Sequence, residues 1–142
     1  MTEKRYRAAI IGLGYIGCAD QVSGDALGQN VEDLDRTHAV ALRNHPAVEL
    51  VAGSSRDAGW RARFTERTDV PTYADWRTML TSEPLDIMSV ATYTPIHAEI
   101  TATCAKQGVC AVYCEKPIAP TGVNAGQMVP ACADAGTLNA TQ

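Results

Sequence analysis

The stretch IIGLGYIG, residues 10–17, follows a short apolar run and brings three glycines together in the pattern GxGxxG. Glycine-rich turns join strands to helices in many folds, so the pattern alone is weak evidence for a nucleotide site. In the dinucleotide fingerprint each glycine has a separate duty. Gly12 would allow the turn out of the strand, Gly14 would let the backbone approach a pyrophosphate, and Gly17 would let the helix lie close to the sheet.

The residues between these glycines predict where an anion would lie. The amides of Tyr15 and Ile16 would face it at the N-terminus of the following helix, where unpaired N–H groups and the helix dipole favour negative charge. The motif also follows the first apolar strand and opens a helical segment, which is the context that a dinucleotide site requires.

Four short runs with almost continuous apolar character predict strands: YRAAIIG, VELVAGSS, LDIMSVAT and VCAVYCE. This composition is typical of parallel strands that are buried on both faces. Candidate helices lie over residues 57–68, 73–82 and 95–108, and a less convincing one, expected to be bent or frayed, spans about 121–135. The alternation predicts an α/β fold: a doubly wound, mostly parallel sheet in three layers, the Rossmann fold, over residues 1–142.

Two details of these elements can be tested directly. The helix over residues 95–108 has clear end signals, since Thr94 suits the N-cap, Pro95 the first helical position and Gly108 a left-handed stop. Residues 18–36 are polar and rich in Asp and Gly, and they interrupt the expected first helix. We interpret them as an inserted loop, either an exposed surface loop or a lid beside the presumed phosphate site.

The end of the second apolar run bears on the choice of nucleotide. The fingerprint places an acidic residue for the ribose hydroxyls about 20 residues after the glycines, an interval that is restored when residues 18–36 are left out. Ser54, Ser55 and Arg56 stand there instead. Small hydroxyls and a guanidinium favour a 2′-phosphate, so NADP is preferred over NAD. Alternatively, Arg56 lies on the solvent face of the next helix, with Asp57 as the helix cap.

Composition excludes several classes of function. The 142 residues are 46% hydrophobic and carry a net charge of −4, so neither nucleic acid nor an anionic membrane is an expected partner. No apolar run approaches the ~18 residues of a membrane span, and a cytoplasmic protein is expected. The five cysteines, odd in number and without a CxxC pair, predict reduced, buried thiols. The three histidines are scattered without ligand spacing, so no metal site is expected.

Five segments together resemble the N-terminal half of the Gfo/Idh/MocA family of NAD(P)-dependent oxidoreductases. They are IIGLGYIG, HAVALRNHPAVELVAGSSRD, VPTYADWRTML, LDIMSVATYTPIHAEI and, most specifically, CEKPIAPT. The resemblance implies hydride transfer between a nicotinamide cofactor, NADP or NAD, and a sugar-like or polyol-like CH–OH group of a small-molecule substrate.

The resemblance also assigns residues. Glu115, Lys116 and Pro117 match the motif that ends a strand where nicotinamide and substrate meet, so Lys116 would be catalytic and bond the reacting oxygen. An ammonium there would stabilise developing negative charge and help to relay the proton. The loop after the third apolar run would pass under the cofactor and contribute Thr92, Thr94, Pro95 and His97, although a capping or packing role suits His97 better. Trp60 and Trp76 are interpreted as packing residues.

Members of this family are about twice as long as this chain and carry a second sheet domain that binds substrate. The resemblance therefore implies that Lys116 stands in half of a site, and it leaves open a homo-oligomer or a partner chain that supplies the rest. A catalytically inactive nucleotide-binding or partner-binding module is the alternative function. A methyltransferase using adenosylmethionine also has a glycine turn, but it explains neither Ser55-Arg56 nor Glu115-Lys116-Pro117.

Overall fold

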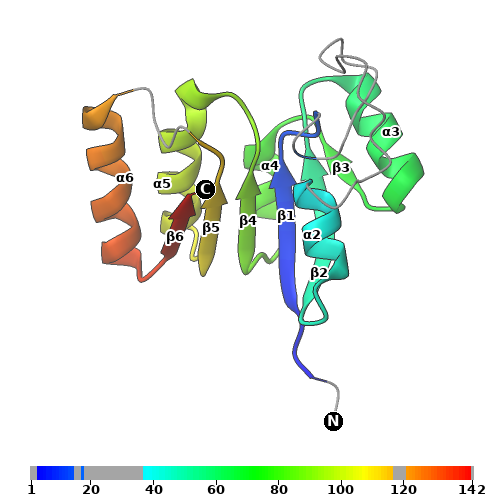
Figure 1. The fold of residues 1–142 in the computed structure, drawn as a ribbon, viewed down its shortest axis with the longest axis horizontal. Coiled ribbons are helices and arrows are strands. Elements are labelled where there is room, and N and C mark those ends of the chain that lie inside the picture. Colours follow the sequence, from blue (N-terminus) through cyan, green and yellow to red (C-terminus); the bar gives the residue numbers. More distant parts are fainter. Residues whose placement is uncertain (1–2, 15–16, 18–36, 117–120, 142) are drawn as a thin grey trace.

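The computed structural model describes residues 3–14, 17, 37–116 and 121–141, which contain one six-stranded sheet (Figure 1). The order across the sheet is β3-β2-β1-β4-β5-β6, and all neighbouring strands run parallel. The strands are β1 (Tyr6–Ile11), β2 (Val48–Ser54), β3 (Thr72–Tyr73), β4 (Ile87–Val90), β5 (Ala111–Cys114) and β6 (Leu138–Thr141). The expected α/β doubly wound sheet is confirmed.

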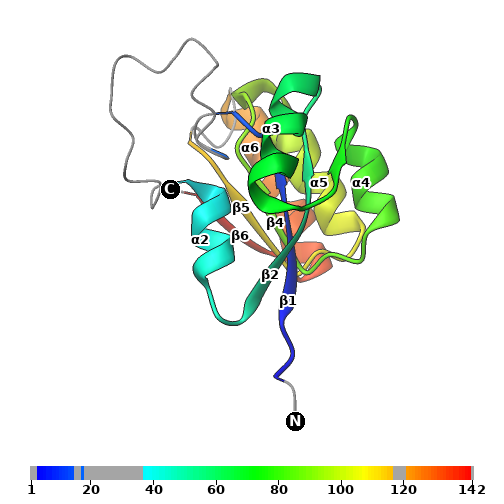
Figure 2. The ribbon, with the colours of Figure 1, turned by 90° about the vertical axis from the view of Figure 1, so that its right-hand side faces the viewer.

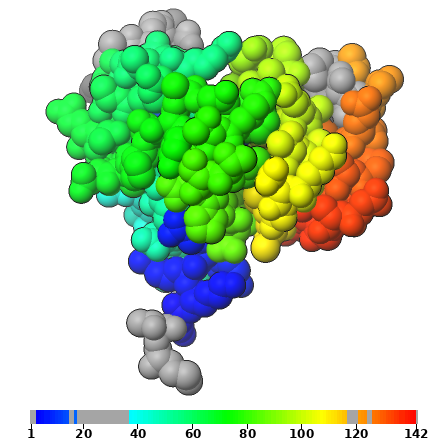
Figure 3. All heavy atoms as spheres, turned by 180° about the vertical axis from the view of Figure 1, so that it is seen from behind, coloured from blue at the N-terminus to red at the C-terminus, as the bar shows by residue number. Residues whose placement is uncertain are grey.

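Helices cover both faces of the sheet, which gives the three expected layers (Figure 2). They are α2 (His38–Asn44), α3 (Ala58–Thr68), α4 (Trp76–Ser82), α5 (His97–Lys106) and α6 (Gly122–Ala135), together with the 3-10 turn η2 (Thr94–Ile96). Figure 3 shows α4, α5 and α6 in succession across one face, and α2 and α3 pack on the other.

The central strand β1 explains the continuous apolar runs. Ala9 and Ile11 pack in the core cluster beneath α4 and α5, whereas Ile10 packs in the cluster beneath α2 and α3. All three are at most 4% exposed. Each isoleucine buried in this way contributes about 1.5–3 kcal/mol relative to an exposed one, so neither face of the strand can be polar without loss of stability.

Aspartates set the starts of two helices. The Asp57 Oδ1 accepts a hydrogen bond of 2.8 Å from the Trp60 amide at the start of α3, as the predicted cap would. Asp75 caps α4 by accepting from the Arg77 amide at 2.8 Å, and this helix therefore begins three residues after the predicted start. A side-chain oxygen at this position satisfies an amide that has no partner within the helix.

The predicted cap at Thr94 is wrong. The chain forms the 3-10 turn η2 over residues 94–96, in which the Ile96 amide donates to the Tyr93 carbonyl, and α5 begins only at His97. Thr94 thus lies inside the first turn, where its hydroxyl has no amide to cap. The predicted stop is confirmed, because Gly108 has a left-handed φ of +83°.

Three elements differ from the expectation, two of them near the C-terminus. The predicted helix over about 121–135 is one continuous element, α6, although Pro130 lies within it. The strand β6, which pairs with β5 in parallel, was not among the predicted strands. The short strand β3 was not predicted either.

The cysteines are free thiols where the structure describes them, and three of the four are buried: Cys104, Cys114 and Cys132. Cys110 is exposed, so the expectation that every thiol is buried was wrong at this position. Burial raises the pKa of Cys104 to about 12 and that of Cys114 to about 11, and it also raises the pKa of Cys132. Cys18 lies outside the described residues.

We expect thiol labelling to distinguish the exposed Cys110 from the three buried cysteines. In a Cys18→Ser variant at pH 8, Ellman's reagent should modify one thiol per chain rapidly, since buried thiols with raised pKa values supply almost no thiolate. Adding Cys110→Ser should remove the fast phase, and urea should expose the other three thiols. A fast phase that survives Cys110→Ser would contradict the described burial.

No helix in the described part of the chain is long and apolar enough to cross a membrane.

Candidate functional site

The carboxyl end of β1 is hydrogen-bonded on both sides, to β2 and to the segment after β4. The Gly12 amide donates to the Ser54 carbonyl of β2 at 2.9 Å, and the Ala91 amide after β4 donates to the Ile11 carbonyl at 2.8 Å. Gly12 has a φ of +99°, and a Cβ there would lie 2.4 Å from the Ala91 carbonyl oxygen. Both the backbone conformation and the space therefore require glycine at this position.

Of the other two glycines, Gly17 has no room for a side chain, and Gly14 has only a tight space for one. A Cβ on Gly17 would lie 1.9 Å from the Gly12 carbonyl oxygen, and one on Gly14 would lie 3.1 Å from the Trp60 ring. Gly12 and Gly17 are thus bare on the side that faces Ala91 after β4, and Gly14 is bare on the side that faces Trp60 of α3. In dinucleotide-binding turns a bare backbone of this kind lets phosphates approach the amides, which a side chain would prevent. Tyr15 and Ile16 lie outside the described residues.

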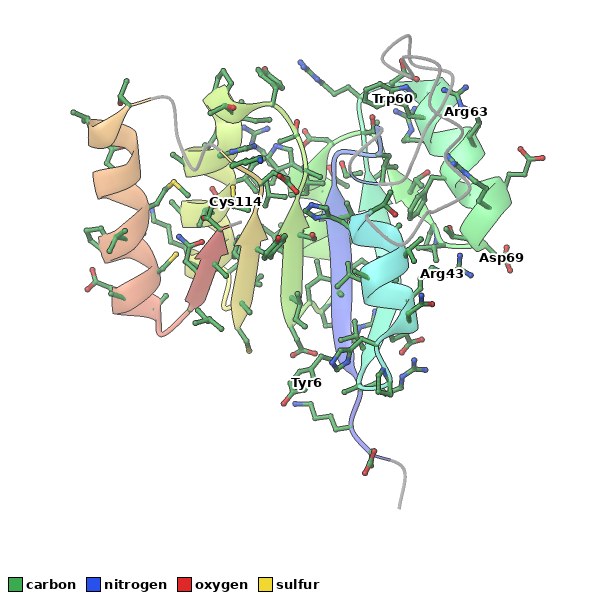
Figure 4. All side chains as sticks on the ribbon, viewed as in Figure 1. Tyr6, Arg43, Trp60, Arg63, Asp69 and Cys114 are labelled. Atoms are coloured by element: carbon green, nitrogen blue, oxygen red, sulfur yellow. The ribbon has the colours of Figure 1, made fainter. Side chains whose placement is uncertain are left out.

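A groove of about 700 Å³ opens beside this turn, where the strand order reverses between β1 and β4. In doubly wound sheets this switch point at the carboxyl edge is where ligands bind. Its lining comes from the ends of β1, β2 and β4 and from the starts of α3, α4 and α5: Ile11, Gly12, Gly14, Ser54, Ser55, Arg56, Asp57, Trp60, Ala74, Asp75, Trp76, Arg77, Ala91, Thr92, Tyr93, Ile96 and Glu99. Figure 4 shows Trp60 at this edge, whereas Tyr6 lies at the opposite end of the sheet.

The loop after β2 forms one rim of the groove. The Arg61 Nη1 donates to the carbonyls of Ser55 and Arg56 at 2.7 and 3.0 Å, and the Ser55 Oγ accepts from the Asp57 amide at 3.2 Å. These bonds fix the backbone of the loop. Ser54 is buried, and the Arg56 side chain extends into solvent with its guanidinium 5.8 Å from the centre of the Tyr93 ring.

The opposite rim follows β4. Thr92 lines the groove, and its carbonyl oxygen lies 2.7 Å from the Nε2 of the buried His97. His97 therefore supports the rim without lining it, in line with the packing role favoured from the sequence. Thr94 and Pro95 are not among the lining residues. Tyr93, which is half exposed, was not anticipated as a lining residue, although it comes directly after the apolar run LDIMSVAT in the sequence, which was a signal for it.

The start of α4 forms a further part of the groove wall. Trp76 is almost fully buried and packs with Met79 and Leu80, and the Arg77 guanidinium lies 4.4 Å from its ring centre. Arg77 also pairs with Glu99 and, at 3.7 Å, with Asp75, so its charge is compensated. Trp60 and Trp76 were interpreted as packing residues, and both also line the groove.

Glu115 follows β5 and takes part in a hydrogen-bonded chain on the α2 face of the sheet. The His38 Nε2 lies 2.7 Å from the Glu115 Oε1, and the His38 Nδ1 contacts the buried Ser89 Oγ. Because a carboxylate only accepts, Nε2 donates to Glu115, and the Ser89 hydroxyl is the partner of Nδ1. Burial and the nearby Glu115 charge raise the pKa of Tyr113, whose ring packs against His38.

Lys116 is exposed directly after Glu115, and neither residue lines the groove. Figure 4 shows Cys114 at the upper end of β5, so Lys116 comes after a strand that ends at the same edge as the groove. Pro117 and residues 18–36 lie outside the described residues. Among the residues that the structure describes, no three His, Cys, Asp or Glu side chains gather as metal ligands.

The fold and the glycine cradle at the switch point define a Rossmann domain with a groove of the dinucleotide-binding kind. The model of the oxidoreductase family with an NAD-binding Rossmann fold, Gfo/Idh/MocA, matches residues 6–141, and the chain belongs to this family. The family resemblance expected from the sequence is confirmed.

Individual relatives are similar over nearly the whole chain. D-apiose dehydrogenase of Paraburkholderia graminis is 33% identical over 140 residues, which cover 95% of this chain and 31% of the relative. The crystal structure of myo-inositol 2-dehydrogenase from Lactobacillus plantarum superposes with a TM-score of 0.79 at 25% identity, covering 98% of this chain and 36% of that one. The WlbA dehydrogenase of Chromobacterium violaceum, in complex with NADH and UDP-GlcNAcA, gives a TM-score of 0.80 at 24% identity, with coverage of 100% and 36%. The chain thus spans about a third of the length of these relatives.

A substitution at Gly12 should be costly. We expect Gly12→Ala to lower the free energy of unfolding by about 2–4 kcal/mol, because it combines a left-handed backbone with a collision against the Ala91 carbonyl. Gly126→Ala, within α6 and with open space around the new Cβ, is the matched control and should stabilise by about 0.5–1 kcal/mol. Urea unfolding measures both, and equal effects of the two variants would contradict the described turn.

Removing His38 should leave a buried hydroxyl without its partner. We expect His38→Leu to cost about 1–3 kcal/mol, and Ser89→Ala in that background to restore part of it, since replacing both members of a buried pair is nearly neutral. His45→Leu changes an exposed histidine and should stay within about 0.5 kcal/mol. Urea unfolding of the unaltered chain, His38→Leu, Ser89→Ala and the double variant gives the coupling, and additive losses would show that the two side chains do not interact.

Proposed function

We propose that residues 1–142 form the dinucleotide-binding domain of an NAD(P)-dependent oxidoreductase that acts on a sugar-like or polyol-like CH–OH group, with NADP preferred and with residues 18–36 as an insertion. The observation that carries the proposal is the bare glycine turn at the switch point, which lies beside a rim formed by Ser55 and Arg56. The sugar and polyol dehydrogenases among the relatives support the substrate class.

Each part of the groove would hold a different part of the cofactor. The amides of Tyr15, Ile16 and Gly17 would bind the pyrophosphate at a helix N-terminus. Thr92, Thr94 and Pro95 would pass beside the dinucleotide, with His97 holding the Thr92 carbonyl in place. Ser54, Ser55 and Arg56 would surround the adenosine ribose, where a guanidinium forms charge-assisted hydrogen bonds with a 2′-phosphate.

The reacting end would lie after β5. When bound, the nicotinamide accepts the hydride from the alcohol carbon. The side-chain ammonium of Lys116 would lie at the substrate oxygen, where it would stabilise the developing negative charge and help to relay the hydroxyl proton. Glu115, held by His38, and Pro117 would set the position of the backbone on either side of Lys116.

Nucleotide binding tests the proposal on the chain itself. NADPH at a hundredfold excess over its dissociation constant should raise the free energy of unfolding by about 2.7 kcal/mol. It should also quench tryptophan fluorescence, since both tryptophans line the groove. Unchanged melting and fluorescence with both NADPH and NADH would overturn the proposal.

The preference for NADP rests on Arg56. We expect Arg56→Gln to weaken NADPH binding about tenfold or more, the loss of a hydrogen bond to a charged group, and to change NADH binding little. Arg43→Gln is the matched control, because Arg43 is exposed on α2 and does not line the groove. Equal weakening of NADPH and NADH by Arg56→Gln would show that Arg56 does not read the 2′-phosphate.

A further inference from the structure

A pair of side chains, one from each rim of the groove, lies close together. The Arg56 guanidinium, from the loop between β2 and α3, lies 5.8 Å from the ring centre of Tyr93, from the segment between β4 and η2. This separation is within the roughly 6 Å over which a cation is attracted to an aromatic face. Both side chains line the groove and both are exposed, so the contact lies at its mouth.

Arg77, the other arginine that lines the groove, differs from Arg56 in having carboxylate partners. Arg77 also lies over a ring, that of Trp76, but its charge is compensated by Glu99 and Asp75. Within the described part of the chain, no carboxylate pairs with the Arg56 guanidinium. The ring of Tyr93 is thus the group that orients Arg56, and its attraction leaves the charge of Arg56 uncompensated.

The backbone around Arg56 is already fixed, because Arg61 binds its carbonyl and that of Ser55. The remaining freedom is that of the Arg56 side chain, which has many rotamers to lose when it binds an anion. An aromatic ring that holds the guanidinium by its face reduces this loss and leaves the N–H groups at its edge free to donate.

We infer that Tyr93 is a positioning residue that orders Arg56 for the phosphate on the 2′-oxygen of the adenosine ribose, and thereby helps to set the preference for NADP over NAD. The inference rests on the proposed function and names a specificity determinant on the rim opposite the Ser55-Arg56 pair. Tyr93 acts through Arg56, so its effect should be confined to the nucleotide that carries the phosphate.

The test compares the dissociation constants of NADPH and NADH, measured by tryptophan quenching, in Tyr93→Leu, Tyr93→Phe and the unaltered chain. We expect Tyr93→Leu to weaken NADPH binding about two- to fivefold, the value of an exposed cation–π contact, and to leave NADH binding unchanged. Tyr93→Phe keeps an aromatic face and should retain the affinity for NADPH. Tyr6→Leu, an exposed tyrosine at the other end of the sheet, is the control and should change neither constant.

The Arg56→Gln background separates positioning from direct contact. There, Tyr93→Leu should have no further effect on NADPH binding. The inference would be overturned if Tyr93→Leu weakened the binding of both nucleotides equally, or left the ratio of their dissociation constants unchanged. It would also be overturned if Tyr93→Leu weakened NADPH binding in the Arg56→Gln background as much as it does in the unaltered chain. If the unaltered chain binds neither nucleotide, or binds both equally, the proposed function or its NADP preference fails, and the inference fails with it.

Discussion

The close approach of three backbone segments at the end of β1 is the constraint on which the rest depends. Gly12 touches the Ala91 carbonyl after β4, and Gly17 touches the Gly12 carbonyl, at distances where no side chain fits. Because these positions are bare, Gly12 and Gly17 can lie against the backbone at the end of the sheet, and β2 and β4 can both pair with β1 up to its end. The groove at the switch point is the space that this packing leaves, and its two rims are the loops that follow those neighbours.

The sequence allowed the sheet to be predicted where the strands are buried on both sides. β1, β2, β4 and β5 are short apolar runs, and β1 at the centre is buried on both faces because helices cover both sides of it, a pattern that differs from an amphipathic helix. β3 has two residues, and Leu138 in β6 is mostly exposed, so neither shows this pattern. These two strands form because a neighbouring strand supplies hydrogen-bond partners, which is information from distant parts of the chain.

The candidate site also contains residues that a local sequence motif could identify and contacts that only the fold creates. Gly12, Gly14, Ser55 and Arg56 could be identified because motif and spacing are local, and the structure gathers them around one groove. The link from His38 to Glu115 joins residues 77 positions apart, and no local pattern marks it. The misplaced cap at Thr94 has a similar origin, since Pro95 suits the first turn of either a 3-10 or an α-helix, and packing of the segment decides between them.

Under the proposed function, affinity and specificity for the nucleotide would reside in different parts of the groove. Backbone amides at the glycine turn would bind a diphosphate that NAD and NADP share, so they could not distinguish the two cofactors. Only side chains after β2, such as Arg56, and side chains that position them, such as Tyr93, could distinguish NADP from NAD. These side chains lie on the rims, where Arg56 and Tyr93 are exposed and contribute little to the core. Their replacement would alter the choice of cofactor at little cost in stability, whereas the glycines would tolerate no such change because the packing of β1 depends on them.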